Sequence, residues 1–423
     1  MTPGARLAAA IDLVDAVLDA ARTGGPPADR LVNDYFRARR YAGSKDRRAV
    51  QDRVFILLRH GMSLSARAAA AGLAPTGRSL VLISAWAGLS AELFDQPHAP
   101  TPPSPGEWTA LQAAATLRDA ALDQAARWEV PAWLMDHLPD DAAAVFPALT
   151  GRAPLDLRVN SVKSDSAAVA DALHQAGIAA QPVDQVATAL RIDPPVALRD
   201  APVLRAGWAD IQDANAQRAC LRAAPAPGQT VIDLCAGAGG KTLALAALMG
   251  NRGRVLAVDV EARRLAALKR RAETLGVTIA EPVALAADGK PRQRWLRQWQ
   301  GQADLVFADV PCSGTGTWRR NPELRWRLTP DWFGDLQAVQ ARLLREAATL
   351  VRPGGKLVYA TCSVLPGENE QQIDRFLGDQ VPFHRAGPDT VWTPAETGGD
   401  GFFTSVLVCS AEGMAATDAD VAP

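Results

Sequence analysis

The chain has 423 residues, which is enough for two or three domains and too many for one small hydrophobic core. Its 45 Lys and Arg residues nearly balance 46 Asp and Glu residues, so a nucleic-acid partner would have to meet a local concentration of positive charge. No apolar run is long enough to span a membrane, and aspartates interrupt the first 25 residues as they would not in a signal peptide, so we expect a soluble, cytoplasmic protein.

Helical periodicity fills residues 1–140, apart from a Pro-rich loop at 97–105. Between Arg30 and Arg59 there are nine Lys and Arg residues against three acids, with aromatic residues interleaved. This segment is either a face that contacts phosphates or a solvated helical surface with internal ion pairs, and its residues alone leave both interpretations open.

A small α+β module is expected over residues 150–225. Alternating apolar residues predict short strands on either side of one helix. The expected elements are the strands Leu155–Val159, Ala189–Ile192 and Ala209–Ile211 and the helix Ser164–Ala176. The module ends at Gln212-Asp213, which opens another helix.

The pattern of residues 226–412 predicts a doubly wound α/β domain, in which buried parallel strands alternate with helices. The tail, 413–423, is small and polar and is expected to be disordered. The expected strands are Thr230–Leu234, Arg254–Asp259, Ala303–Asp309 and Gly355–Thr361, with a weaker one at Val283–Ala287.

The Gly-rich turn Cys235–Thr242 follows the first of these strands, at the end where open parallel sheets bind ligands. A dinucleotide fingerprint would fit Gly237 and Gly239 but lacks its third glycine. A phosphate-binding P-loop would fit Gly240-Lys241-Thr242 but lacks its first glycine. A third interpretation is a methyltransferase loop, whose glycines let the backbone approach the amino-acid end of S-adenosylmethionine.

Two acids at other strand ends favour a nucleoside among these ligands. Asp259 follows the turn by about 20 residues, the spacing at which a carboxylate reaches ribose hydroxyls. Asp288, after the weaker strand, would suit an adenine amino group. Each acid alone is weak evidence, because strand-end carboxylates often cap the next helix.

Two of the five cysteines follow strand ends beside Gly or Ser, namely Cys312 and Cys362. Methylation of cytosine C5 is difficult because this carbon is a poor nucleophile, and a thiolate that adds to C6 makes C5 electron-rich. Asp309 could hydrogen-bond or protonate the ring as charge develops. Cys220 and Cys409 are expected to be buried, and the absence of a CxxC pair argues against a metal site.

At these motifs the chain resembles the Sun/RsmB family of RNA cytosine-5 methyltransferases, from about residue 155 to residue 409. The principal motifs are Asp233-Leu-Cys-Ala-Gly-Ala-Gly-Gly-Lys-Thr242, Asp309-Val-Pro-Cys-Ser-Gly-Thr-Gly316 and Ala360-Thr-Cys-Ser363. The resemblance extends to Leu157-Arg-Val-Asn160, Gln212-Asp213, Glu368-Asn-Glu370 and Asp400-Gly-Phe-Phe403.

The resemblance implies a Rossmann-like methyltransferase domain, preceded by the α+β module and an all-helical NusB-like RNA-binding domain. It also implies that Cys362 is the nucleophile and that Cys312 assists product release, a division that residue chemistry alone does not give. The cofactor would be S-adenosyl-L-methionine and the partner RNA, in particular ribosomal RNA, with no membrane or metal involved and the protein a monomer. The residues expected to bind the cofactor are Cys235, Ala236, Gly237, Ala238, Gly239, Gly240, Lys241, Asp259, Arg264, Asp288 and Asp309.

Two features qualify this picture. Gly237-Ala238 stand where the family usually has Ala-Pro, and we expect the loop to keep its shape and its cofactor. The Trp- and Arg-rich stretch Thr317–Arg327, after the Pro-Cys motif, is expected to hold phosphates and stack on bases of an unpaired or flipped target.

Three rival hypotheses stay open on the sequence. The near-match to a P-loop suggests an NTPase, which would bind ATP and not S-adenosylmethionine. A non-catalytic RNA-binding or assembly factor could use the same fold, although it would have no need of both cysteines. A DNA target is the third.

Overall fold

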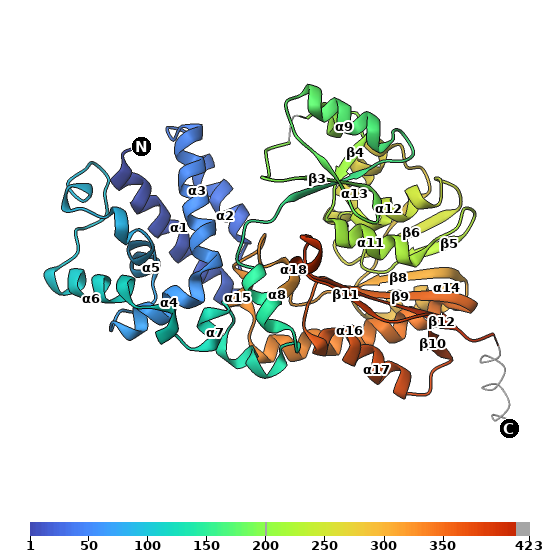
Figure 1. The fold of residues 1–423 in the computed structure, drawn as a ribbon. Helices are drawn as coiled ribbons and strands as arrows, with labels where there is room; N and C mark the ends of the chain where they lie inside the picture. The colour runs from blue at the N-terminus through green and yellow to red at the C-terminus, as the bar shows by residue number, and fades with distance from the viewer. Residues whose placement is uncertain (199–200, 412–423) are drawn as a thin grey trace. The chain divides into compact units, whose positions relative to one another are not determined.

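The computed structural model describes residues 1–198 and 201–411, which form two compact units, coloured along the chain in Figure 1. The first unit contains residues 1–152 and 317–333, and the second contains residues 153–316 and the chain from Gly334. The tail 413–423, expected to be disordered, lies outside the described residues. In the part of the chain that is described, no helix has both the length and the apolar character needed to cross a bilayer.

The first unit is helical, as expected. Its core is built on α1, whose residues Leu13, Val14 and Val17 are at most 1% exposed and which packs against α3 and α5. In α3 the apolar residues at helical spacing, from Val50 to Leu58, are buried and the charged residues face outward. The helices are α1 (Pro3–Thr23), α2 (Ala28–Ala38), α3 (Ser44–Arg59), α4 (Gly61–Ala70), α5 (Gly77–Ser84), α6 (Pro105–Thr116), α7 (Gln124–Arg127), α8 (Ala142–Ala148) and α15 (Leu324–Arg327).

Residues 317–333 complete this unit, although they follow the Pro-Cys motif in sequence. Trp318 is fully buried and packs against Phe146, and the guanidinium of Arg325 lies over its ring at 4.8 Å. Arg325 is 1% exposed and donates to the carbonyl oxygens of Glu129 and Leu149, at 3.0 and 3.2 Å. We expected this segment to present its Trp and Arg side chains to RNA. That expectation is wrong for Trp318 and Arg325, because both side chains are buried inside the helical unit.

The second unit begins with a four-stranded antiparallel sheet in the order β2-β3-β1-β4. Its core includes Leu157, Leu173 and Leu190, so the α9 helix covers one face of the sheet. The elements are β1 (Leu155–Val159), α9 (Ser166–Gln175), β2 (Gln181–Val183), β3 (Val186–Ile192), α10 (Pro202–Arg205) and β4 (Ala209–Ile211). This is the small α+β module expected from the sequence, with one more strand.

The larger sheet has a parallel centre, in which β5 lies between β6 and β8, and β9 lies next to β8. Successive residues Val231 and Ile232 belong to different apolar clusters, so both faces of the sheet are covered by helices. The strands are β5 (Thr230–Asp233), β6 (Arg254–Asp259), β7 (Ala280–Ala284), β8 (Ala303–Asp309), β9 (Val351–Thr361), β10 (Phe383–Arg385), β11 (Thr390–Trp392) and β12 (Phe402–Cys409). The helices are α11 (Ala214–Ala223), α12 (Gly240–Leu248), α13 (Ala262–Leu275), α14 (Gly289–Trp299), α16 (Pro330–Leu350), α17 (Glu370–Gly378) and α18 (Pro394–Thr397).

Two details differ from the expected sheet. The sheet is mixed, because β12 pairs antiparallel with β9. No strand was predicted from the sequence at the position of β12. The edge strand β7 ends at Ala284, opposite Asp259 of β6, rather than at 287. Asp288 therefore directly precedes the helix α14, at its N-cap position, instead of ending a strand.

We predict that Gly61 and Gly106, which both lie near the start of a helix in the first unit, respond oppositely to alanine. A Cβ on Gly61 would lie 2.0 Å from a ring carbon of Trp326, whereas one on Gly106 would meet nothing within 4 Å. Gly61→Ala should lower the free energy of unfolding by about 1–3 kcal/mol through overpacking. Gly106→Ala should raise it by about 0.5–1 kcal/mol, because alanine favours the helix.

Urea unfolding, read out by hydrogen exchange in α1 to α4, measures both changes. Equal stabilisation by the two substitutions would show that Trp326 does not occupy the space beside Gly61.

Candidate active site

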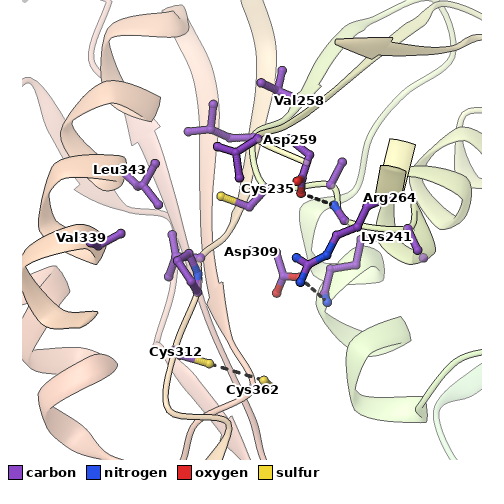
Figure 2. A pocket seen from close by; sticks show the side chains of 18 of the residues that line it. Cys235, Lys241, Val258, Asp259, Arg264, Asp309, Cys312, Val339, Leu343 and Cys362 are labelled. Atoms are coloured by element: carbon purple, nitrogen blue, oxygen red, sulfur yellow. Dashed lines mark hydrogen bonds and ion pairs between the residues drawn. The ribbon is translucent and has the colours of Figure 1, made fainter. Parts of the chain in front are cut away.

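A cavity of about 650 Å³ opens at the carboxyl ends of β5, β6, β8 and β9 (Figure 2). The strand-end residues Asp259 and Asp309 line it, and so do both cysteines, Cys312 and Cys362. Apolar side chains of β6 and α16, among them Val258 and Leu343, form another part of its wall. Parallel strands that end at one edge of the sheet thus bring together residues from Cys235 to Cys362, which are 127 positions apart.

The Gly-rich turn forms the part of the wall between β5 and α12. Gly237 and Gly239 have φ values of +55° and +85°, which glycine adopts without strain. A Cβ on Gly239 would lie 2.4 Å from Cγ of Leu268, so this position also needs glycine for space. Because the φ value of Gly237 is positive, glycine suits this position, and the loop departs here from the expected family pattern without strain.

Asp259 holds the turn in place. One carboxylate oxygen accepts a hydrogen bond from the N–H of Gly237 at 2.8 Å, and the other accepts from the N–H of Glu261 at 2.8 Å. The side chain thus fixes the backbone of the Gly-rich turn and the backbone just before α13, and it still lines the cavity. Each oxygen keeps a second lone pair for a hydroxyl of a ligand.

Of the other residues predicted to bind the cofactor, most line the cavity and two do not. Cys235, Ala236, Ala238, Gly240 and Arg264 line the cavity, whereas Gly239 lies behind the turn against Leu268. Asp288 is exposed and does not line the cavity, although its neighbour Ala287 does. Its role toward adenine stays a prediction.

The two cysteines meet at one end of the cavity, where their sulfur atoms are 3.4 Å apart. The hydrogen bond with Cys362, together with burial and the Cys362 charge, raises the pKa of Cys312 well above its ordinary value. Cys312 is therefore a neutral thiol next to the sulfur of Cys362. Such a pair can supply one nucleophilic sulfur and one proton donor or acceptor at the same point.

An ion pair stands beside the cysteines. Nζ of Lys241 donates to the carboxylate of Asp309 at 2.6 Å. Burial opposes the charge on Lys241, but the Asp309 carboxylate outweighs it and raises the pKa of the lysine. Lys241 therefore stays charged, so this pair offers a carboxylate and an ammonium to a polar ligand in the cavity.

Several residues that line the cavity were not predicted from the sequence. Gln212 was noted only within a motif, and Arg292, Val339, Arg342 and Leu343 carried no signal at all. The last four lie on α14 and α16, where an occasional residue facing a cavity looks the same in sequence as one facing solvent or core. Among the described residues, no group of three or more His, Cys, Asp or Glu side chains could hold a metal ion.

Comparison with known proteins gives a consistent assignment. Residues 220–408 match the family model described as 16S rRNA methyltransferase RsmB/F, and residues 130–199 match the ferredoxin-like domain of RsmF/B-like methyltransferases. The ribosomal RNA small subunit methyltransferase B of Vibrio cholerae serotype O1 is 34% identical over 308 residues, which are 70% of this chain and 68% of the relative. The protein of the same name from Pasteurella multocida is 35% identical over 292 residues, 66% of this chain and 64% of that one.

The fold also matches solved structures. The crystal structure of PH0851 has a TM-score of 0.74 and 26% sequence identity, and the match covers 93% of this chain and 98% of that one. Since this match covers nearly the whole chain, it includes the fold of the helical region as well as that of the Rossmann-like domain.

Asp233, at the end of β5, yields a pH prediction. It is fully buried, one carboxylate oxygen accepts from Oγ1 of Thr242 at 2.6 Å, and the other has no hydrogen-bond partner. Burial raises its pKa to about 7; the Thr242 hydrogen bond opposes this shift and the nearby Asp309 charge adds to it. The folded state thus keeps a proton that the unfolded chain loses near pH 4.

Stability should therefore fall as pH rises from about 4 to about 7, because the unfolded chain binds fewer protons in this window. In the wild type, this proton should lower the free energy of unfolding by about 3 kcal/mol between pH 5 and pH 8. Asp233→Asn should remove this fall, and urea unfolding at both pH values measures it. Asp335→Asn, on the surface of α16, is the control and should leave the fall in place. If Asp233→Asn keeps the fall as well, Asp233 ionises normally.

Proposed function

The chain belongs to the RsmB/F family of 16S rRNA methyltransferases, and from this premise we propose that it methylates C5 of a cytosine in ribosomal RNA through a covalent cysteine adduct. The observation that carries the proposal is the contact between the sulfur atoms of Cys312 and Cys362, 3.4 Å apart at the wall of one cavity. Methyl transfer to an oxygen or to an exocyclic nitrogen needs no such pair, whereas C5 chemistry needs a sulfur nucleophile and a means of releasing it.

The cavity fits S-adenosyl-L-methionine. The turn at Gly237 offers backbone without a side chain, Asp259 offers carboxylate lone pairs to ribose hydroxyls, and Val258 and Leu343 offer apolar surface to a purine. When bound, the cofactor supplies an electrophilic methyl group.

The residues of the chain then have separate tasks. The thiolate of Cys362 would form a bond to C6 of cytosine, which places electron density on C5; C5 would then bond to the methyl carbon as the bond between that carbon and its sulfonium sulfur breaks. Once protonated, Asp309, which Lys241 fixes, donates a hydrogen bond to the ring nitrogen where negative charge develops. After the C5 proton leaves, the bond between C6 and Cys362 breaks, and Cys312 assists this release from 3.4 Å away.

We further propose that the basic segment of α2 and α3 contacts RNA. Tyr41 is 76% exposed, and Arg40, Lys45 and Arg48 around it are exposed as well. Part of the segment instead forms internal ion pairs, because Arg30 and Arg37 both contact Asp34. The positive surface available to phosphates is therefore centred on the α2–α3 turn. The protein would act as a monomer in the cytoplasm, where ribosomal RNA is made and assembled.

Bisulfite sequencing of total RNA, with and without the gene, tests the activity. One cytosine of small-subunit RNA should lose its methylation in the strain that lacks the gene and regain it when the gene is restored. If no cytosine changes, the chain is not a cytosine-C5 methyltransferase under those conditions of growth, and the RNA-binding or assembly role gains support.

We predict opposite outcomes for the two cysteine variants. Cys362→Ala should abolish turnover and form no covalent adduct with RNA, because the nucleophile is missing. Cys312→Ala should also stop turnover but accumulate an adduct, because the bond to C6 forms and is not broken. Denaturing gel electrophoresis with labelled RNA detects the adduct.

Cys220→Ala is the matched control, since Cys220 is buried in the core and does not line the cavity. It should turn over normally and accumulate no adduct. Adduct accumulation in Cys362→Ala and its absence in Cys312→Ala would reverse the two roles.

A further inference from the structure

Arg271, on the helix α13, joins the Gly-rich turn of the cavity to the small α+β module. Its Nη1 donates to the carbonyl oxygen of Ala238 in the turn at 2.6 Å, and its Nη2 donates to the carboxylate of Asp210 on β4 at 2.5 Å. The side chains of Arg271 and Asp210 are 30% and 17% exposed, so solvent screens their contact only in part. Ala238 lines the cavity, whereas Arg271 and Asp210 lie outside it.

Asp210 is a fixed support for this guanidinium. It lies opposite Arg158 of β1 in the antiparallel pair that β1 forms with β4. Arg158 is 4% exposed, and its Nη2 contacts the same oxygen of Asp210 at 3.4 Å. The other oxygen of Asp210 accepts from the N–H of Ile211 at 3.1 Å. Burial lowers the pKa of Arg158 and the Asp210 carboxylate opposes this shift, so a buried positive charge keeps the carboxylate in place.

The module also holds the carboxyl end of α13. Nδ2 of Asn160 donates to the carbonyl oxygen of Leu275 at 2.8 Å, and Nζ of Lys163 donates to that of Thr274 at 2.7 Å. A Cβ on Gly207 would lie 2.0 Å from the carbonyl oxygen of Thr274, so the backbone of the module lies directly against this helix end. The last carbonyl groups of a helix have no partner within it, and here the module supplies their partners.

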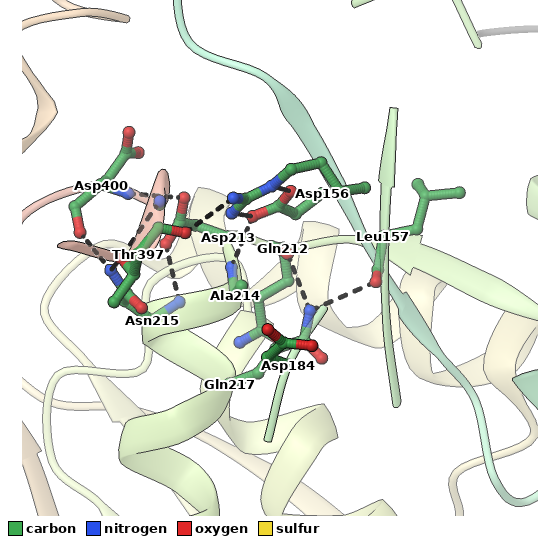
Figure 3. A network of polar contacts seen from close by, with 12 residues as sticks. Asp156, Leu157, Asp184, Gln212, Asp213, Ala214, Asn215, Gln217, Thr397 and Asp400 are labelled. Atoms are coloured by element: carbon green, nitrogen blue, oxygen red, sulfur yellow. Dashed lines mark hydrogen bonds and ion pairs between the residues drawn. The ribbon is translucent and has the colours of Figure 1, made fainter. Parts of the chain in front are cut away.

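A second set of contacts attaches the module to the start of α11 (Figure 3). The carboxylate of Asp156 on β1 accepts from the N–H of Ala214 at 3.0 Å, and the carbonyl oxygen of Leu157 accepts from Nε2 of Gln217 at 3.3 Å. Arg158, the next residue of β1, therefore starts from a backbone that is fixed to the catalytic domain.

The turn needs such support because of its composition. Ala238 stands between Gly237 and Gly239, and two glycines leave many backbone conformations open to a turn that nothing holds. Asp259 holds the N–H of Gly237 at 2.8 Å, and Arg271 holds the carbonyl oxygen of Ala238. A turn that is fixed in advance loses less conformational entropy when a ligand binds to it.

We propose that Arg271 is a positioning residue for the cofactor, and that the α+β module, through Asp210, fixes the Gly-rich turn before the cofactor binds. This inference rests on the proposed function, because it takes the cofactor as the ligand of the cavity. The module thereby takes part in cofactor binding, although no residue of its strands β1 to β4 lines the cavity.

Calorimetric titration tests the proposal without any turnover. Arg271→Met keeps an unbranched side chain and removes the donors, so it should weaken binding of S-adenosylhomocysteine about fivefold to tenfold. Binding of 5′-methylthioadenosine, which lacks the amino-acid end that the turn would meet, should change by less than about twofold. Arg270→Met, at an exposed position on the same helix, is the matched control and should bind both ligands as the wild type does.

Two further measurements separate this role from a loss of folding. Asp210→Asn should weaken binding of S-adenosylhomocysteine in the wild type and add nothing to Arg271→Met, because Asp210 acts through Arg271. In ligand-free Arg271→Met, the amides of residues 236–240 should exchange hydrogen faster than in the wild type and regain protection when S-adenosylhomocysteine binds. The amides of β8 and β9 should keep their protection throughout.

Three outcomes overturn the proposal. In the first, Arg271→Met binds S-adenosylhomocysteine as tightly as the wild type does. In the second, it weakens both ligands equally, which would indicate a general change in the cavity. In the third, the effects of Asp210→Asn and Arg271→Met add, which would show that the module does not act through this guanidinium. Failure of the wild type itself to bind S-adenosylhomocysteine would instead refute the proposed function.

Discussion

The active site depends on the parallel pairing of β8 with β9. In this register Asp309 lies opposite Ala360, so both strands end at the same level of the sheet. The loops that follow, with Cys312 three residues beyond Asp309 and Cys362 directly after Thr361, are thereby forced to the same point. A slip of the register would separate the two sulfur atoms, since one residue of strand spans about 3.3 Å, nearly the whole distance between them.

A buried carboxylate then fixes the loop that carries Cys312. Glu368 is fully buried, and its Oε1 accepts from the N–H of Ser313 at 2.8 Å and from Nε2 of Gln340 at 2.9 Å. Nε2 of Gln340 also donates to the carbonyl oxygen of Pro311 at 3.0 Å. The Glu368-Asn-Glu motif, distant in sequence from the cysteines, thus acts by holding the backbone on both sides of Cys312. A loop held at two points keeps the thiol in contact with Cys362 without a ligand present.

The sequence predicted the parts of this site that depend on local rules. Strand ends, the turn glycines and the two cysteines could be read directly, because buried strands have a clear pattern and ligands bind at one edge of a parallel sheet. Asp288 was misplaced because β7 is an edge strand, whose end is set by its pairing with β6 rather than by its own composition. The Trp- and Arg-rich segment was misjudged because its burial depends on residues far earlier in the chain: Arg325 donates to carbonyl groups 176 and 196 residues before it, and Trp318 packs against Phe146. Nothing local distinguishes an arginine that binds such carbonyls from one that binds phosphate.

The segment 317–333 has a further structural consequence. Gly316 belongs to the unit that holds the cysteines, and Thr317 belongs to the helical unit, so the chain passes from one to the other four residues after Cys312. Gly316 is itself fixed in the catalytic unit, where its N–H donates to the carbonyl oxygen of Cys362 at 3.0 Å and its carbonyl oxygen accepts from Gly401 at 2.8 Å. The helical unit cannot be removed cleanly at residue 152, because Trp318 and Arg325 would lose the interior that buries them. The Pro-Cys loop is therefore held by Glu368 within the catalytic unit, and the chain then continues into a segment whose Trp318 and Arg325 are buried in the helical unit.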